Sequence, residues 1–178
     1  PGLPWFYGRS TSGGKSLGFD EISKISHMNK PYDISTVCSK KRTLHTKHRL
    51  RYKFTKKLKQ KIPSMKVFGY DSCRIDDKSK ALDDYKFHVA IENHFAPHHW
   101  TEKLADCFLS WTMPIYYGCT NLTKYFPPQS FIQIDINSPE STIEELKTKL
   151  TYEFWESAFD SIREARELVL NKYQLFPF

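Results

Sequence analysis

Short apolar runs alternate with longer amphipathic segments along most of the chain. Runs that are rich in β-branched and aromatic residues, and that end at turn residues, predict β-strands. Such runs occupy Tyr32–Cys38, Met65–Tyr70, a segment from Tyr85 that stops at Glu92-Asn93, Met113–Tyr117 and Phe131–Ile136. The segment Arg74–Asp84 is polar and charged, which predicts an exposed loop.

Other segments have apolar residues three and four positions apart, which is the spacing of one helix face. In Arg49–Ile62, for example, Phe54, Leu58 and Ile62 are each four residues apart, with lysines between them. The remaining predicted helices begin after Thr101 and cover Thr120–Tyr125, Ser141–Leu150 and Tyr152–Leu170. The order β-α-β-β-α-β-α-β-α-α predicts an α/β fold with an open, largely parallel sheet and helices on both faces.

The central stretch reads as a βαβ unit. Phe87, Val89 and Ile91 alternate on one strand face, and Thr101 is well placed to cap the following helix. In such units ligands bind beyond the carboxyl ends of the strands, near helix N-termini. We therefore expect a ligand site there, lined by polar side chains that can bind hydroxyls and phosphates, namely Glu92, Asn93, His99, Glu102 and Lys103.

Length and composition suit one domain with a sizeable core, since the chain has 178 residues of which 39% are hydrophobic. No apolar run approaches the roughly 20 residues that a membrane-spanning helix needs. The first residue is Pro1 and there is no signal peptide, so we expect a fragment or a processed chain. The four cysteines contain no CxxC pair, which argues against a zinc site.

The formal charge is +7, and its excess lies in one segment, because Ser39–Lys61 contains eleven Lys and Arg and no acidic residue. Such a block indicates either an anionic ligand or a solvated helix face. A nucleic-acid-binding domain would need stacking aromatics among these charges, and only Tyr52 and Phe54 are present, with Phe54 on the apolar stripe.

The central stretch also resembles the signature of the α-1,3/4-fucosyltransferase family. The family has an aromatic-Lys/Arg-Phe strand, then Glu-Asn, then seven residues, then Thr-Glu-Lys. The corresponding residues here are Tyr85-Lys86-Phe87, Glu92-Asn93 and Thr101-Glu102-Lys103, and a Pro-Ile strand that ends at Gly118 follows. Upstream, Val67-Phe68-Gly69 followed by a cysteine is similar to the family as well. Several matched elements at fixed spacing make this a specific signal.

The resemblance implies a Rossmann-like domain over residues 30–178, as the GDP-sugar donor-binding half of a GT-B glycosyltransferase, with an interdomain junction or N-terminal arm over residues 1–29. It implies inverting transfer of fucose from GDP-fucose to a hydroxyl of an acceptor glycan, as in α-1,3-fucosyltransferases. The family's catalytic base is a carboxylate in the N-terminal acceptor-binding domain, which this chain is expected to lack, so no base is nominated. The isolated chain is expected to bind the donor weakly and to turn over poorly.

Family positions carry over to six residues. Lys103 is expected to stabilise the departing diphosphate, and Arg51, or Arg49 in another register, to hold it from the other side. Glu102 suits the ribose hydroxyls, and Asn93 suits ribose or sugar. Two positions stay open. Glu92 either faces the sugar or supports the loop, and His99 stands where the family usually has Tyr, which puts donor affinity and donor choice in question.

Cationic side chains hold the donor in this family, so no cofactor or metal is expected beyond GDP-fucose as substrate. His94, His98 and His99 invite a metal hypothesis, but no carboxylate or Cys completes a ligand set at suitable spacing. Lys40 replaces an Asn of the family pattern. With His99, it motivates a second hypothesis, a relative that binds a sugar nucleotide without catalysis; a different GDP-sugar donor is a third.

No nucleic-acid partner is expected. The resemblance places a eukaryotic relative on the luminal side of the Golgi membrane, and a bacterial one in the cytoplasm or at the membrane periphery.

Overall fold

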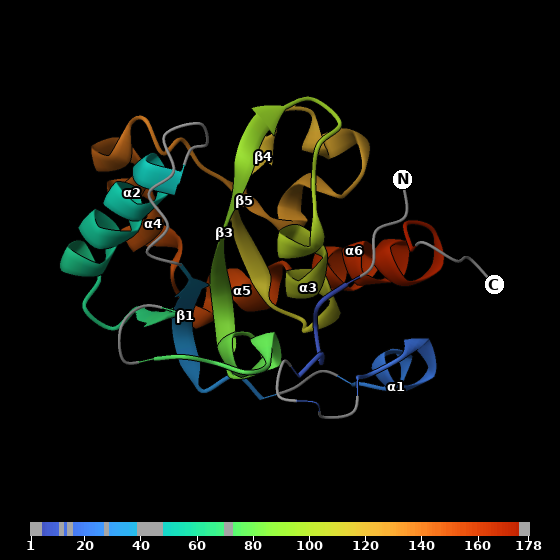
Figure 1. The fold of residues 1–178 in the computed structure, drawn as a ribbon. Coiled ribbons are helices and arrows are strands. Elements are labelled where there is room, and N and C mark those ends of the chain that lie inside the picture. Colours follow the sequence, from blue (N-terminus) through green and yellow to red (C-terminus); the bar gives the residue numbers. More distant parts are fainter. Residues whose placement is uncertain are drawn as a thin grey trace.

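The computed structural model describes residues 5–10, 13, 16–26, 29–38, 48–69 and 73–174. Its centre is one five-stranded sheet in which every neighbouring pair of strands is parallel. The strands are β1 (Tyr32–Val37), β2 (Lys66–Phe68), β3 (Tyr85–Ala96), β4 (Met113–Cys119) and β5 (Ile132–Gln133). The predicted α/β fold with a parallel sheet is thus confirmed (Figure 1).

The strand order is β2-β1-β3-β4-β5, which is the order of a doubly wound sheet. After β1 the chain proceeds outward to β2, and it then returns to the other side of β1 to form β3. The connections on the two sides of this point diverge, so they leave a crevice above the carboxyl ends of β1 and β3. In open α/β sheets that switch point is where ligands bind.

Helices cover both faces of the sheet (Figure 1). The described helical segments are α1 (Phe19–Ser23), α2 (His48–Lys61), α3 (Glu102–Leu109), α4 (Pro139–Lys149), α5 (Tyr152–Ser157) and α6 (Phe159–Asn171), with short 3₁₀ turns η1 (Lys78–Ala81), η2 (Leu122–Lys124) and η3 (Pro128–Ser130). In Figure 1, α2 and α4 lie on the left of the sheet and α3 and α6 on the right.

Two apolar clusters correspond to the two faces. One contains Val89 and Ile91 of β3 together with side chains of α2, α4 and α5. The other contains Ala90, which points to the opposite face, together with side chains of α3 and α6. Successive residues of a strand point to opposite faces, so a strand covered on both sides is apolar at every position, as the middle of β3 is.

The described part of the N-terminal segment packs onto the second cluster. Tyr7 is 2% exposed and its hydroxyl donates to Asp83, while Ile22 of α1 is fully buried. The guanidinium of Arg166 in α6 donates to the carbonyl of Ile22 and lies over the ring of Trp111. The segment therefore forms part of the core in this structure. The division into residues 1–29 and 30–178 stays a prediction.

Four predicted boundaries were wrong. β3 continues past Glu92-Asn93 to Ala96, because a register shift brings Ala96 opposite Cys119 of β4. The predicted strand Phe131–Ile136 is reduced to β5, and Thr120–Tyr125 contains only the turn η2. The predicted helix Tyr152–Leu170 is two helices, interrupted at Ala158.

The segment Arg74–Asp84 is also not the exposed loop that its polar sequence predicts. It contains η1, whose first residue Lys78 forms an ion pair with Asp106 of α3, and Ala81 and Leu82 are fully buried. The segment thus covers the α3 side of the sheet.

Candidate functional site

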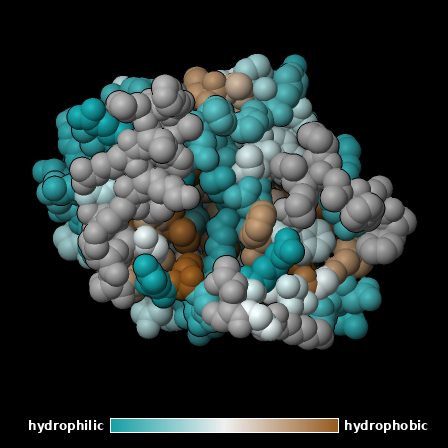
Figure 2. Space-filling view, viewed as in Figure 1, coloured by the Kyte–Doolittle hydropathy of each residue, from teal (hydrophilic) through white to brown (hydrophobic). Residues whose placement is uncertain are grey.

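A cavity of about 330 Å³ lies at the switch point of the sheet. Its walls include Val37 at the end of β1, residues 88–91 of β3, Arg51 of α2 and the first turn of α3. In the view of Figure 1, the middle of the molecule is hollowed, and hydrophilic residues run between hydrophobic ones there (Figure 2). The cavity lies beyond the carboxyl ends of β1 and β3, where the βαβ unit predicts that a ligand binds.

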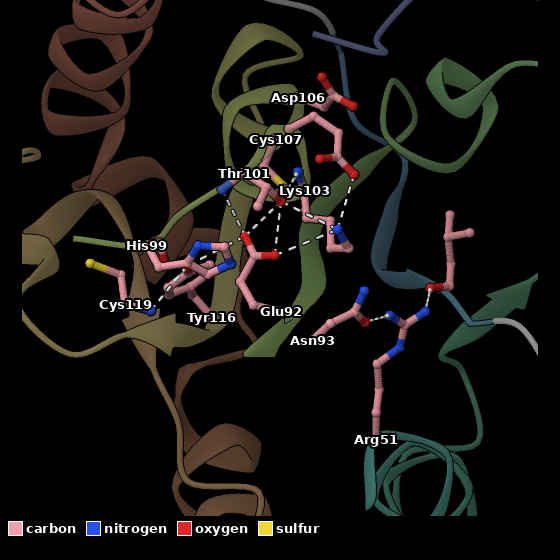
Figure 3. A network of polar contacts seen from close by, with 12 residues as sticks. Arg51, Glu92, Asn93, His99, Thr101, Lys103, Asp106, Cys107, Tyr116 and Cys119 are labelled. Carbon is pink, nitrogen blue, oxygen red and sulfur yellow. Dashed lines mark hydrogen bonds and ion pairs between the residues drawn. The ribbon is translucent and has the colours of Figure 1, made fainter. Parts of the chain in front are cut away.

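Arg51 ties the two central strands together at their carboxyl ends (Figure 3). Its Nη2 donates to the carbonyl oxygen of Val37 at 3.3 Å, and its Nη1 lies 3.5 Å from Oδ1 of Asn93. The guanidinium lines the cavity, so the residue chosen from the predicted register reaches the site. Asn93 is therefore connected to the site through Arg51.

Glu92 supports the loop between β3 and α3. Its side chain is 1% exposed, and Oε1 accepts from the backbone N of Thr101 at 2.9 Å and from its hydroxyl at 2.8 Å. Nζ of Lys103 lies 3.5 Å from Oε2. Of the two roles that the sequence leaves open for Glu92, this geometry favours support of the loop.

The first turn of α3 brings Glu102 and Lys103 into the cavity. Thr101 caps the helix as predicted, since its hydroxyl accepts from the backbone N of Lys103. Nζ of Lys103 lies 3.0 Å from Oε1 of Glu102. Burial opposes ionisation of Glu102, but Lys103 and Lys78 outweigh burial and lower its pKa, so the carboxylate is charged at neutral pH.

His99 lies apart from the cavity wall. Its ring packs edge-on against His94, with 5.6 Å between centroids, and its carbonyl oxygen accepts from the hydroxyl of Tyr116. The described residues that line the cavity include Arg51, Glu102 and Lys103 but neither Asn93 nor His99. Five of the six predicted residues thus gather at one edge of the sheet, with Arg51, Glu102 and Lys103 on the cavity wall and Glu92 and Asn93 in contact with them. His99 is connected to this group through the hydroxyl of Tyr116, which also lies 3.5 Å from Oε1 of Glu92.

Several cavity residues were missed by the sequence analysis, among them Phe6, Arg9, Asp76, Lys78 and His88. They come from the N-terminal segment, from the supposed loop and from the interior of β3, and nothing local in the sequence marks those of the first two segments as ligand-facing. For His88 a signal was available, because side chains alternate between the two faces of a strand. This alternation puts His88 on the same face as Ala90, which faces α3.

The cavity is positively charged. Among the described residues, four cationic and two acidic side chains line it, namely Arg9, Arg51, Lys78 and Lys103 against Asp76 and Glu102. Burial, followed by the nearby charge of Lys78, lowers the pKa of His88 to about 3, so this imidazole is neutral. An excess of cations in a cleft of low dielectric favours an anionic ligand.

Within the described ranges there is no group of three or more His, Cys, Asp and Glu side chains that could hold a metal ion. The same part of the chain contains no helix with the length and apolar character that a membrane span requires.

Comparison with known proteins relates this chain to one family model and to curated proteins. Residues 28–156 match the family model described as glycosyltransferase family 10 (fucosyltransferase) C-term. An alpha-(1,3)-fucosyltransferase FucT of Helicobacter pylori is 33% identical over 82 residues, which are 46% of this chain and 16% of that protein. A GDP-fucose protein O-fucosyltransferase 3 of Danio rerio is 34% identical over 89 residues, covering 48% of this chain and 19% of that protein.

Crystal structures with the same fold include the following two. One is of an alpha1,3-fucosyltransferase with GDP-fucose, with a TM-score of 0.59 and 19% identity, covering 88% of this chain and 52% of that one. The other is of an alpha1,3-fucosyltransferase with GDP, with a TM-score of 0.60 and 22% identity, covering 87% and 52%. The chain thus spans about half of the solved structures that it matches and less than a fifth of these two curated relatives. Because the family model covers most of its length and the sheet has the matching architecture, the chain belongs to glycosyltransferase family 10, the fucosyltransferases.

Proposed function

We propose that this chain is the donor-binding half of an inverting fucosyltransferase, which transfers fucose from GDP-fucose to a hydroxyl of an acceptor glycan. The observation that carries the proposal is the convergence of Arg51 and Lys103 on one cationic cavity at the switch point of a parallel sheet. Family membership supports it, and so do the ligands GDP-fucose and GDP that the titles of the two similar crystal structures name.

The reaction requires that the negative charge on the departing diphosphate is stabilised. The acceptor oxygen attacks the anomeric carbon of fucose, the bond from that carbon to the β-phosphate oxygen breaks, and GDP leaves with one more negative charge than it had in the donor. Lys103 is placed to stabilise this charge together with the N-terminus of α3. Arg51 presents a planar guanidinium, which can donate two parallel hydrogen bonds to a phosphate.

Glu102, which is ionised, suits the ribose hydroxyls as a hydrogen-bond acceptor. Oδ1 of Asn93 lies 3.5 Å from Nη1 of Arg51, and we expect its amide to bind ribose or sugar. Glu92 acts through Thr101 and Lys103, whereas His99 packs against His94 away from the cavity wall. The base that removes the acceptor proton belongs, in this proposal, to an N-terminal acceptor-binding domain, and no metal takes part.

In the basic block Ser39–Lys61, which suggested an anionic ligand, some side chains make contacts within the protein. Residues 39–47 of that block, which include Lys40, lie outside the described residues. Within α2, Lys57 pairs with Glu140, and Lys59 donates to two carbonyl groups beyond the end of the helix. Arg51 faces the cavity. These contacts favour a nucleotide pocket over a nucleic-acid surface.

Calorimetry on the 178-residue chain tests the proposal. GDP and GDP-fucose should compete for one site, and UDP-sugars should not displace them. Replacing Arg51 with alanine should weaken GDP binding, whereas replacing Arg163, an exposed arginine paired with Asp160, should leave it unchanged. Equal binding of GDP and UDP, or no nucleotide binding, would refute the proposed donor site.

A second candidate is a relative that binds a sugar nucleotide without transferring it. The observation that favours it is the position of His99, whose ring contacts His94 at the edge of the site where the family usually carries Tyr. A transfer assay on a longer form with both halves separates the two functions. GDP binding without any fucosylated lactosamine-type product would support the second candidate, and product from GDP-mannose rather than GDP-fucose would indicate another donor.

Location stays a proposal that depends on the source, namely the luminal side of the Golgi membrane in a eukaryote and the cytoplasm or membrane periphery in a bacterium. Fractionation of cells that express the natural form tests it.

A further inference from the structure

An ion pair between Lys78 and Asp106 joins the cavity to the protein interior. The carboxylate of Asp106 in α3 is 0% exposed, and its Oδ2 accepts from Nζ of Lys78 at 2.8 Å. Its Oδ1 accepts from the backbone N of Phe6 at 2.9 Å. Lys78 and Phe6 both line the cavity, so one buried carboxylate positions two parts of its wall.

The two members of the pair are unequally buried. The side chain of Lys78 retains 18% of its exposure and lines the cavity, whereas the carboxylate is sealed from solvent. An ammonium group has three N–H donors. Asp106 takes one of them, and among the described residues no second acceptor lies within hydrogen-bond distance of Nζ.

The lysine is charged at neutral pH. Burial works against its protonation, but Asp106 and, more weakly, Glu102 overcome that effect and raise the pKa of Lys78. Glu102 shares the cavity with Lys103, and its own pKa is lowered partly by the charge of Lys78. The ammonium of Lys78 therefore contributes to the potential in the same cavity as Arg51 and Lys103.

A purely structural role explains this arrangement poorly. Burying an ion pair costs desolvation energy, and apolar residues of similar volume often replace such a pair without loss of stability. An ammonium that is oriented by a buried carboxylate, lines the cavity and has N–H donors that no other described residue accepts is instead suited to bind an anion.

We propose that Lys78 is a further donor-binding residue, the third cation around the diphosphate besides Arg51 and Lys103, and that Asp106 is the positioning residue that orients its ammonium. The inference rests on the proposed function, since it takes the anion to be the diphosphate of a guanine nucleotide. A donor diphosphate carries two negative charges, and the leaving GDP gains another, so a third cation binds the product side of the reaction most strongly.

The test compares GDP, GMP and guanosine binding by calorimetry. Lys78→Met alone would leave Asp106 without its counter-ion, so the informative variant is the double replacement Lys78→Met/Asp106→Asn, which removes both charges. The asparagine keeps an acceptor for the backbone N of Phe6. A control is Lys86→Met/Asp33→Asn, which removes a Lys–Asp pair at 3.0 Å near the opposite end of β3; its lysine is 11% exposed, but its carboxylate is 53% exposed.

We expect the Lys78/Asp106 double variant to bind GDP about tenfold or more weakly, as the loss of a charge-assisted hydrogen bond predicts. The loss should be smaller for GMP and absent for guanosine. The control should bind all three like the wild type. If the Lys78/Asp106 variant binds GDP within about twofold of the wild type, or if all three ligands weaken equally, Lys78 is only structural and the inference is wrong.

A measurement on the wild type covers the case in which the double variant does not fold. Saturating GDP should slow the reaction of the Lys78 amine with an acylating reagent, read by mass spectrometry, and should leave Lys86 unaffected. An unchanged rate at Lys78 would contradict the inference while the proposed function stands. If the wild-type chain binds no guanine nucleotide at all, the proposed function fails first and this inference fails with it.

Discussion

Replacing Glu92 with alanine should destabilise the protein far more than replacing a typical surface glutamate. The carboxylate is 1% exposed and accepts hydrogen bonds from the backbone N and the hydroxyl of Thr101. Thr101 is the N-cap residue of α3. It is also an ion-pair partner of Lys103 at 3.5 Å. Its removal leaves the partly buried N–H of Thr101 without an acceptor, the start of α3 without its contact to β3 and Lys103 without one of its two counter-ions.

The magnitude follows from these contacts. A hydrogen bond to a charged group contributes about 1.5–3 kcal/mol, and removing one member of a buried ion pair costs about 3–5 kcal/mol. The contributions overlap, and Lys103 keeps a 24% exposed side chain and its contact with Glu102, so water and Glu102 relieve part of the loss. We therefore expect the free energy of unfolding to fall by about 3 kcal/mol.

Urea unfolding, followed by tryptophan fluorescence, to which the nearby buried Trp100 contributes with the other three tryptophans, measures this loss. Glu102→Gln is the control, since its side chain is 26% exposed and its pair with Lys103 should contribute less than about 1 kcal/mol. If Glu92→Ala lowers stability by less than about 1 kcal/mol yet abolishes GDP binding, the carboxylate acts on the ligand and the support role is refuted.

Three further predictions concern the same edge of the sheet. Gly118→Ala should cost about 1–3 kcal/mol in urea unfolding, because an added Cβ would lie 2.4 Å from Cγ of Glu92; an unchanged midpoint would mean that this contact relaxes freely. Burial lowers the pKa of His88 to about 3, so the unfolded chain binds one more proton below its ordinary pKa of about 6.5. Stability from this group is complete above that pH and is lost as the pH falls, by about 2 kcal/mol between pH 7 and pH 5, and His88→Gln should remove that difference; equal losses in both proteins would contradict it. Arg51→Lys should weaken GDP binding about tenfold in calorimetry because lysine lacks the planar pair of donors, with Arg163→Lys as the unaffected control; equal affinity would show that charge alone suffices.

Local sequence determined the elements of the central unit. The alternation in β3, the capping threonine and the continuous apolar run of β4 are short-range signals, and each predicts one element. The predicted cap at Thr101 is confirmed, because a hydroxyl that bonds the helix's first N–H groups acts over only two or three residues. The resemblance of the same stretch to a family then indicated which polar residues to watch.

Hydrophobic periodicity did not predict the helix boundary that tertiary contacts determine. The apolar stripe from Trp155 to Val169 continues without a Gly or Pro, yet the helix is interrupted at Ala158. At this point Phe159 stacks on Trp111, with 5.2 Å between ring centroids, and Trp155 packs into the first apolar cluster. Contacts with residues 40 or more positions away have no local signature, so the break could not be predicted from spacing.

The strand order also came only from the tertiary structure, and the site depends on it. A linear element order allows several sheets, and only the placement of β1 between β2 and β3 puts the switch point beside Arg51. Lys78 illustrates the same limit, since a charged residue in a polar segment predicts solvent exposure. Its partner Asp106 lies 28 residues further along the chain, and burial against that carboxylate turned the lysine toward the cavity. The sequence alone therefore determined which residues could bind an anion, because residue chemistry is local. Which of them meet was decided by long-range packing, because distance in space is not encoded in spacing along the chain.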